Sequence, residues 1–118
     1  ETFKRCLDAA QKHLEFYPGD IRPRLLGAIA LIELGETERG LEWTRRALEL
    51  DSLDPNVLYN AACAFSISGE LEEAITCLER SLPFCADRKW LDYDSYLDPL
   101  RGLPRFQELL WVGPNQRR

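Results

Sequence analysis

Residues 21–36, IRPRLLGAIALIELGE, and residues 55–70, PNVLYNAACAFSISGE, share one pattern at a distance of 34 positions. An aspartate precedes each segment, small and aliphatic residues fill it, and Gly-Glu closes it. Further along the chain the same shift pairs Glu38 with Glu72, Leu41 with Ile75, Arg46 with Arg80 and Leu48 with Leu82. An internal period of this length is typical of stacked helical units, so it decides the fold class.

Each unit is predicted to be an antiparallel pair of helices. The apolar residues recur three, four or seven positions apart, which is the spacing of one helix face. Asp20 and Asp54 stand where N-caps are expected, and Pro55 suits the first helical position. Gly35 and Gly69 can adopt the left-handed conformation that ends a helix and turns the chain. The expected helices span residues 21–34, 36–50, 55–68 and 70–82.

Small residues recur where these helices would touch. Close approach of two helix axes, at about 8–10 Å, requires small side chains at the contact. The small residues expected at these contacts are Gly27, Ala28, Ala30 and Ala47 in one unit and Ala61, Ala62, Ala64 and Ala74 in the next.

The residues at these positions resemble the tetratricopeptide repeat, a helix-turn-helix unit of 34 residues. With Gly35 and Gly69 at position 15, residues that fit the pattern are Ala28, Leu31, Ala47, Ala62, Phe65, Ala74 and Leu78. Departures from it are Arg24, Gly27, Gly40, Ser52 and Ala86. The resemblance implies an all-α fold, a right-handed α-α superhelix with a C-terminal capping helix.

We expect the chain to form a single domain over 1–118. The period divides this domain into four parts. Residues 1–20 are interpreted as the second half of a truncated repeat, 21–54 and 55–88 as whole repeats, and 89–118 as a capping segment. The sequence contains no methionine, so we expect it to be a segment of something longer.

The capping segment is predicted to contain a short helical turn at Lys89–Tyr93 and a terminal helix at Pro104–Trp111. Phe106, Leu109 and Leu110 would pack on the last repeat. This tail resembles the one that closes tetratricopeptide arrays at the C-termini of bacterial class III adenylate or guanylate cyclases and of some bacterial serine/threonine kinases.

Composition and motifs argue against several classes of function. A net charge of −5 disfavours a nucleic-acid partner, and the longest apolar run, residues 25–34, is about half a membrane span. His13 is the single histidine, and no catalytic, cofactor or metal motif is present. The alternate acids from Asp92 to Asp98 lack the glycine and the glutamate of a calcium loop. The four cysteines have no short spacing, so free thiols in a cytoplasmic protein are favoured, although two disulfides stay possible.

The resemblance implies a groove lined by the first helix of each pair. Carried over by position, its peptide-binding residues are Arg22, Leu25, Ile29, Asn56, Tyr59, Asn60 and Cys63, with Ile32, Glu33, Ser66 and Ile67 on the same face. Tyr59 would be the anchor, with Arg22 and Asn56 at the rim. Asn60 matches one asparagine of a chaperone-binding clamp, but Leu25 and Ile29 stand where the rest of that clamp would be. Alternatively, an upstream helix would cover Leu25 and Ile29, leaving no site.

The function expected first is that of a non-catalytic scaffold or regulatory module that binds a protein or peptide on its concave face. A second expectation is the regulatory tail of a nucleotide cyclase or kinase. A third is a homodimer through the N-terminal repeat face, on which Leu7, Ala10 and Leu14 would lack a partner helix.

Overall fold

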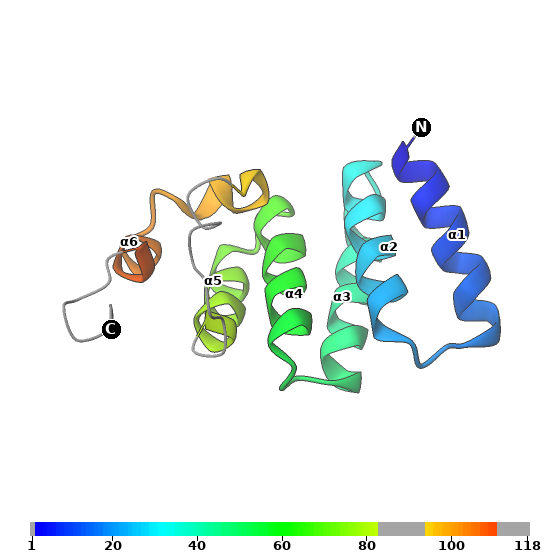
Figure 1. Cartoon of the computed structure of the whole chain (residues 1–118). Coiled ribbons are helices and arrows are strands. Elements are labelled where there is room, and N and C mark those ends of the chain that lie inside the picture. Colours follow the sequence, from blue (N-terminus) through cyan, green and yellow to red (C-terminus); the bar gives the residue numbers. More distant parts are fainter. Residues whose placement is uncertain (1, 83–93, 111–118) are drawn as a thin grey trace.

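The computed structural model describes residues 2–82 and 94–110, and in these ranges the secondary structure is entirely helical. The elements are α1 (Thr2–Phe16), α2 (Ile21–Glu33), α3 (Thr37–Leu50), α4 (Pro55–Ile67), α5 (Leu71–Ser81), the 3₁₀ helix η3 (Ser95–Leu100) and α6 (Pro104–Leu110). Figure 1 shows α1 to α5 side by side in chain order. The all-α class predicted from the period is confirmed, and α1 to α5 lie where the sequence placed helices.

Two glycines turn the chain between the helices of each pair. Gly35 and Gly69 have φ angles of 95° and 91°, a region that side-chain-bearing residues rarely adopt. The N–H of Glu36 donates to the carbonyl of Leu31 at 2.8 Å, and Glu70 repeats this bond to Phe65 at 2.9 Å. Each of these hydrogen bonds closes a turn of six residues and gives a partner to a carbonyl near the end of α2 or α4. The predicted glycine caps are therefore confirmed, and each brings the next helix back alongside the previous one.

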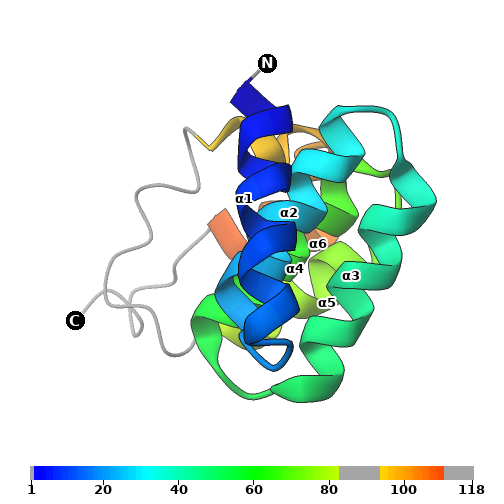
Figure 2. The same cartoon turned by 90° about the vertical axis from the view of Figure 1, so that its right-hand side faces the viewer.

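The packing repeats from one pair to the next. The α2 helix packs most extensively on α3, and α4 packs most extensively on α5. Between the pairs, α4 contacts both α2 and α3, while α1 packs on α2. Figure 2 looks along this row, with α1 in front of α2 and α3 beside them. The first helices of the two pairs, α2 and α4, are thus neighbours, and equivalent residues on them face the same region of the surface.

The small residues lie at these contacts, as the sequence predicted. Ala28, Ala47, Ala61, Ala62 and Ala74 are all completely buried. Such side chains let two helix backbones approach without leaving a void. The larger core residues Leu31, Phe65, Ile75 and Leu78 fill the remaining space and are at most 1% exposed.

The C-terminal part of the described chain joins the same core. Leu97 and Leu100 of η3, and Phe106 of α6, are completely buried in the cluster that α2, α4 and α5 form. The packing of Phe106 and Leu109 was predicted, whereas η3 was not. The expected turn at Lys89–Tyr93 lies outside the described residues.

One expectation about the N-terminal turn needs correction. Asp54 accepts a hydrogen bond from the N–H of Asn56 at 2.8 Å, as an N-cap should. Asp20 occupies the N-cap position of α2, as predicted, but its side chain makes no such bond. Asp20 Oδ2 lies 2.6 Å from Nε2 of His13 instead. The His13 side chain is 43% exposed, and its ring lies against Tyr17. The histidine therefore joins the end of α1 to the following turn.

The N-terminal face also differs from expectation. Leu7 and Ala10 were expected to lack a partner helix, but they are only 7% and 5% exposed, and Leu14 is half-buried. Leu7 packs with Ala30 and Leu31 of α2. The apolar face of α1 is therefore covered by α2, and the large hydrophobic side chains that α1 leaves exposed are Phe3 and Phe16.

Candidate binding site between helices α2 and α4

A cavity of about 490 Å³ opens between the N-terminal parts of α2 and α4; we call it the polar cavity because five of its nine lining residues are polar or charged. Its lining residues are Ile21, Arg22, Leu25, Leu26, Asp51, Asp54, Asn56, Val57 and Asn60. Two of its polar groups come from the turn between α3 and α4. There Asp51 Oδ1 accepts the N–H groups of Leu53 and Asp54, at 2.9 and 3.2 Å. This turn therefore fixes one wall of the cavity.

An apolar cavity of about 270 Å³ adjoins the first one. It is lined by Phe3, Cys6, Leu26, Ile29, Ala30, Tyr59, Asn60, Cys63, Asp94 and Tyr96. The residues come from α1, α2, α4 and the start of η3, so the cavity joins segments that are far apart in the sequence. Leu26 and Asn60 line both cavities, and Leu26 is 44% exposed. The two cavities therefore form one hollow, with Leu26 and Asn60 between its halves.

All seven residues predicted to bind a peptide line this hollow. Arg22, Leu25 and Asn56 line the polar cavity; Ile29, Tyr59 and Cys63 line the apolar one; and Asn60 lines both. Arg22 and Asn56 are exposed at the rim, whereas Leu25, Ile29 and Cys63 are at most 8% exposed. These three buried side chains form the floor of the site rather than an open groove surface. Ile32, Glu33, Ser66 and Ile67, also expected on this face, line neither cavity.

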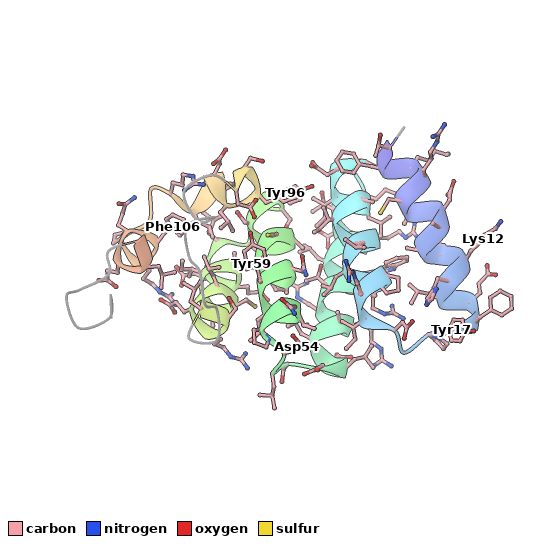
Figure 3. The ribbon with its side chains drawn as sticks, in the orientation of Figure 1. Lys12, Tyr17, Asp54, Tyr59, Tyr96 and Phe106 are labelled. Carbon is pink, nitrogen blue, oxygen red and sulfur yellow. The ribbon has the colours of Figure 1, made fainter. Side chains whose placement is uncertain are left out.

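Tyr59, the expected anchor, already has a partner within the chain. Its hydroxyl donates a hydrogen bond to Oδ2 of Asp94, and Asp94 Oδ1 accepts the N–H of Tyr96 at 3.0 Å. Asp94 thus caps η3 and ties it to α4 at the same time. Figure 3 shows Tyr59 on α4 and Tyr96 in η3. The tail of the chain supplies one wall of the apolar cavity.

Sequence reasoning missed six residues of the apolar cavity: Phe3, Cys6, Leu26, Ala30, Asp94 and Tyr96. Leu26 could have been predicted, because it lies 34 positions before Asn60, which is a predicted site residue. Nothing in the sequence pattern places Asp94 and Tyr96 beside α4, since the period ends before them.

The Cys63 thiol of the hollow is neutral at physiological pH. Burial raises the pKa of Cys63 to about 12, so this residue behaves as a small apolar side chain rather than a nucleophile. Cys6 is half-buried and donates from Sγ to the carbonyl of Leu26 at 3.8 Å. Within the described ranges Cys6, Cys63 and Cys77 are free, and Cys85 lies outside them.

Burial and nearby negative charges raise the pKa of Tyr96, which lines the apolar cavity. Burial, followed by the negative charge of Glu33, raises the pKa of the Tyr96 hydroxyl above its usual value, and Asp94 acts in the same direction. The hydroxyl therefore stays protonated and can donate a hydrogen bond to an occupant.

The described acids among the alternate residues from Asp92 to Asp98 bond to other groups of the chain. Asp94 bonds to Tyr59 and Tyr96, and Asp98 pairs with Arg101 at 2.8 Å, while Asp92 lies outside the described residues. Over residues 2–82 and 94–110, no three histidine, cysteine or acidic side chains converge in a way that could hold a metal ion. In the same part of the chain, no helix combines the length and apolarity needed to cross a membrane.

Comparison of the chain with family models, with curated proteins and with solved structures gives no match.

Proposed function

We propose that this chain is a protein-interaction module of the tetratricopeptide-repeat type, a right-handed superhelix of helix pairs that binds a peptide in the hollow between α2 and α4. The observation that carries the proposal is that all seven residues chosen from repeat positions line two adjoining cavities. Its partner is a protein or peptide, and the module itself performs no reaction.

The repetition along the chain supports this assignment. The shift of 34 residues takes α2 onto α4 and α3 onto α5, so that Arg22 matches Asn56, Leu25 matches Tyr59 and Ile29 matches Cys63. Members of each matched pair line the two adjoining cavities. Repeated helix pairs offer extended surface with few groups arranged for chemistry, which suits recognition better than catalysis.

The chemistry of the hollow also favours a peptide. An apolar cavity beside polar side chains can take one side chain of a partner and hydrogen-bond its neighbours. Asn60 stands between the cavities, and its Nδ2 donates to the carbonyl of Asn56 at 2.9 Å. That bond leaves the amide oxygen of Asn60 free to accept from a partner's main chain.

The test is selection of binders from a library of random displayed peptides, followed by affinity measurement on the enriched sequences. We expect Leu26→Gln to weaken binding about tenfold or more, because Leu26 lines both cavities. Fluorescence anisotropy with the synthesised peptides would give the dissociation constants.

Leu53→Gln is the matched control. Leu53 is also an exposed leucine, at 77%, but it lines neither cavity, so its replacement should change the affinity less than about twofold. Thermal melts followed by circular dichroism would show that both variants fold. Equal affinities for Leu26→Gln and the original chain would refute the assignment of the site.

A further inference from the structure

The charges that line the hollow are unbalanced. Arg22 supplies one positive charge, and Asp51, Asp54 and Asp94 supply three negative ones, a net formal charge of −2. Within the described ranges none of these four residues forms an ion pair. A concave surface with an excess of one sign attracts groups of the opposite sign.

Neutral donors bind all three carboxylates. Asp51 and Asp54 accept main-chain N–H groups, while Asp94 accepts the Tyr59 hydroxyl and the N–H of Tyr96. These bonds orient the oxygen atoms but leave each negative charge in place. A cation brought beside them would gain charge-assisted hydrogen bonds without displacing an existing ion pair.

Asp94 is the one of these three carboxylates that lines the apolar cavity. It is half-buried in the wall of the apolar cavity, among Phe3, Ile29 and Cys63. A carboxylate in apolar surroundings is less well solvated than one at an open surface. The raised pKa of the neighbouring Tyr96 hydroxyl reflects burial and negative charge at this end of the hollow.

The apolar cavity has room for one large side chain. Its volume is about 270 Å³. An engineered apolar cavity of about 150 Å³ holds benzene, so a leucine or phenylalanine side chain fits here. Leu26, half exposed at the entrance, would pack on that side chain.

We propose that the occupant is a cationic peptide segment, in which one large apolar side chain fills the apolar cavity and adjacent lysine or arginine side chains face Asp94, Asp51 and Asp54. This inference rests on the proposed function and adds the class of partner. Arg22 opposes binding of such a peptide, and its removal should strengthen binding.

The experiment uses four fluorescein-labelled synthetic peptides of equal length. In three of them a central leucine is flanked by lysines, by serines or by glutamates; in the fourth, alanine replaces the leucine between the lysines. Anisotropy titrations with the full chain give the affinities. We expect the lysine–leucine peptide to bind about tenfold more tightly than the glutamate–leucine peptide, and about tenfold more tightly than the lysine–alanine peptide.

Arg22→Glu and Lys12→Glu form a matched pair, because each changes the net charge by two. Arg22 lines the polar cavity, whereas Lys12 lies on the outer side of α1, away from Tyr59 (Figure 3). Arg22→Glu should strengthen binding of the lysine–leucine peptide about threefold or more, and Lys12→Glu less than about twofold.

A glutamate–leucine peptide that binds as tightly as the lysine–leucine peptide would overturn the inference, as would equal effects of the two substitutions. If the serine–leucine peptide binds in a Leu26-dependent way without any charge preference, the proposed function stands and only the cationic partner is refuted. If no peptide shows binding that depends on Leu26, both fail.

Discussion

Replacing Phe106 by alanine is expected to lower the free energy of unfolding by about 3–5 kcal/mol, which is the usual loss for a fully buried phenylalanine. Phe106 is completely buried in the cluster shared by α4 and α5, and the Arg101 guanidinium lies 5.4 Å from the centre of its ring. Without the ring, α6 loses its main apolar contact with the helix pairs. A thermal melt followed by circular dichroism should show the midpoint falling by about 10 °C or more.

Phe16→Ala is the control for this prediction. Phe16 has the same side chain but is 77% exposed, so its replacement should change stability by less than about 0.5 kcal/mol. Equal midpoints for the two variants would contradict the placement of α6 in the common core.

Gly40→Ala is expected to destabilise the fold by about 1–2 kcal/mol, although alanine favours helix over glycine by about 1 kcal/mol. A Cβ at Gly40 would lie 2.5 Å from Cγ1 of Ile32 and 2.8 Å from the main-chain oxygen of Ala28. The oxygen belongs to the backbone of α2, so α2 and α3 must move apart to admit the methyl group. Chemical denaturation, with the midpoint and slope compared, measures the loss.

Gly102→Ala provides the matched comparison, because a Cβ there would have nothing within 4 Å. That substitution should leave stability nearly unchanged. If Gly40→Ala proved more stable than the original chain, the close contact between α2 and α3 would be refuted.

Arg105 gives α6 a second attachment, to α5. Its guanidinium bonds to Glu79 at 2.6 and 3.1 Å, and to Glu72 at 2.9 Å. The Arg105 side chain is 40% exposed, so solvent screens these pairs and their contribution to stability is small. The burial of Phe106 therefore holds α6 in place more strongly than these ion pairs do, and the alanine substitution tests that burial.

The helices were predictable because local rules and the period agreed. Apolar spacing located α2 to α5, and Gly35 and Gly69 marked the turns, where their positive φ angles are now found. Asp20 shows the limit of such rules: its residue type suits an N-cap, but the His13 side chain takes its carboxylate instead. A local propensity does not reveal which partner a side chain finds across a turn.

Only the part of the candidate site formed by the two equivalent helices, α2 and α4, could be predicted from the sequence. The seven predicted residues follow from positions in α2 and α4, and the shift that relates Arg22 to Asn56 also relates Leu26 to Asn60. Asp94 and Tyr96 lie beyond the period, and their place beside Tyr59 depends on the path of the tail. The same kind of tertiary contact explains Leu7 and Ala10, whose partner proved to be α2.

The placement of Asp94 has a consequence for recognition. The tail that completes the core also supplies a carboxylate and a tyrosine to the apolar cavity, so it would contribute to the proposed binding site. If the proposed function holds, two chains with the same repeats but different tails should differ in the peptides they select.

The most direct test of the central claim is a titration of the ¹⁵N-labelled chain with the lysine–leucine peptide, followed by amide chemical shifts. We predict that the shifted amides concentrate in residues 3–6 of α1, 21–30 of α2, 51–63 up to and along α4, and 94–96 at the start of η3, because these segments line the hollow. Amides along α3 and α5 that face away from it should stay in place. Shifts confined to α3 and α5, or no shifts at a peptide concentration that saturates binding, would contradict the proposed site.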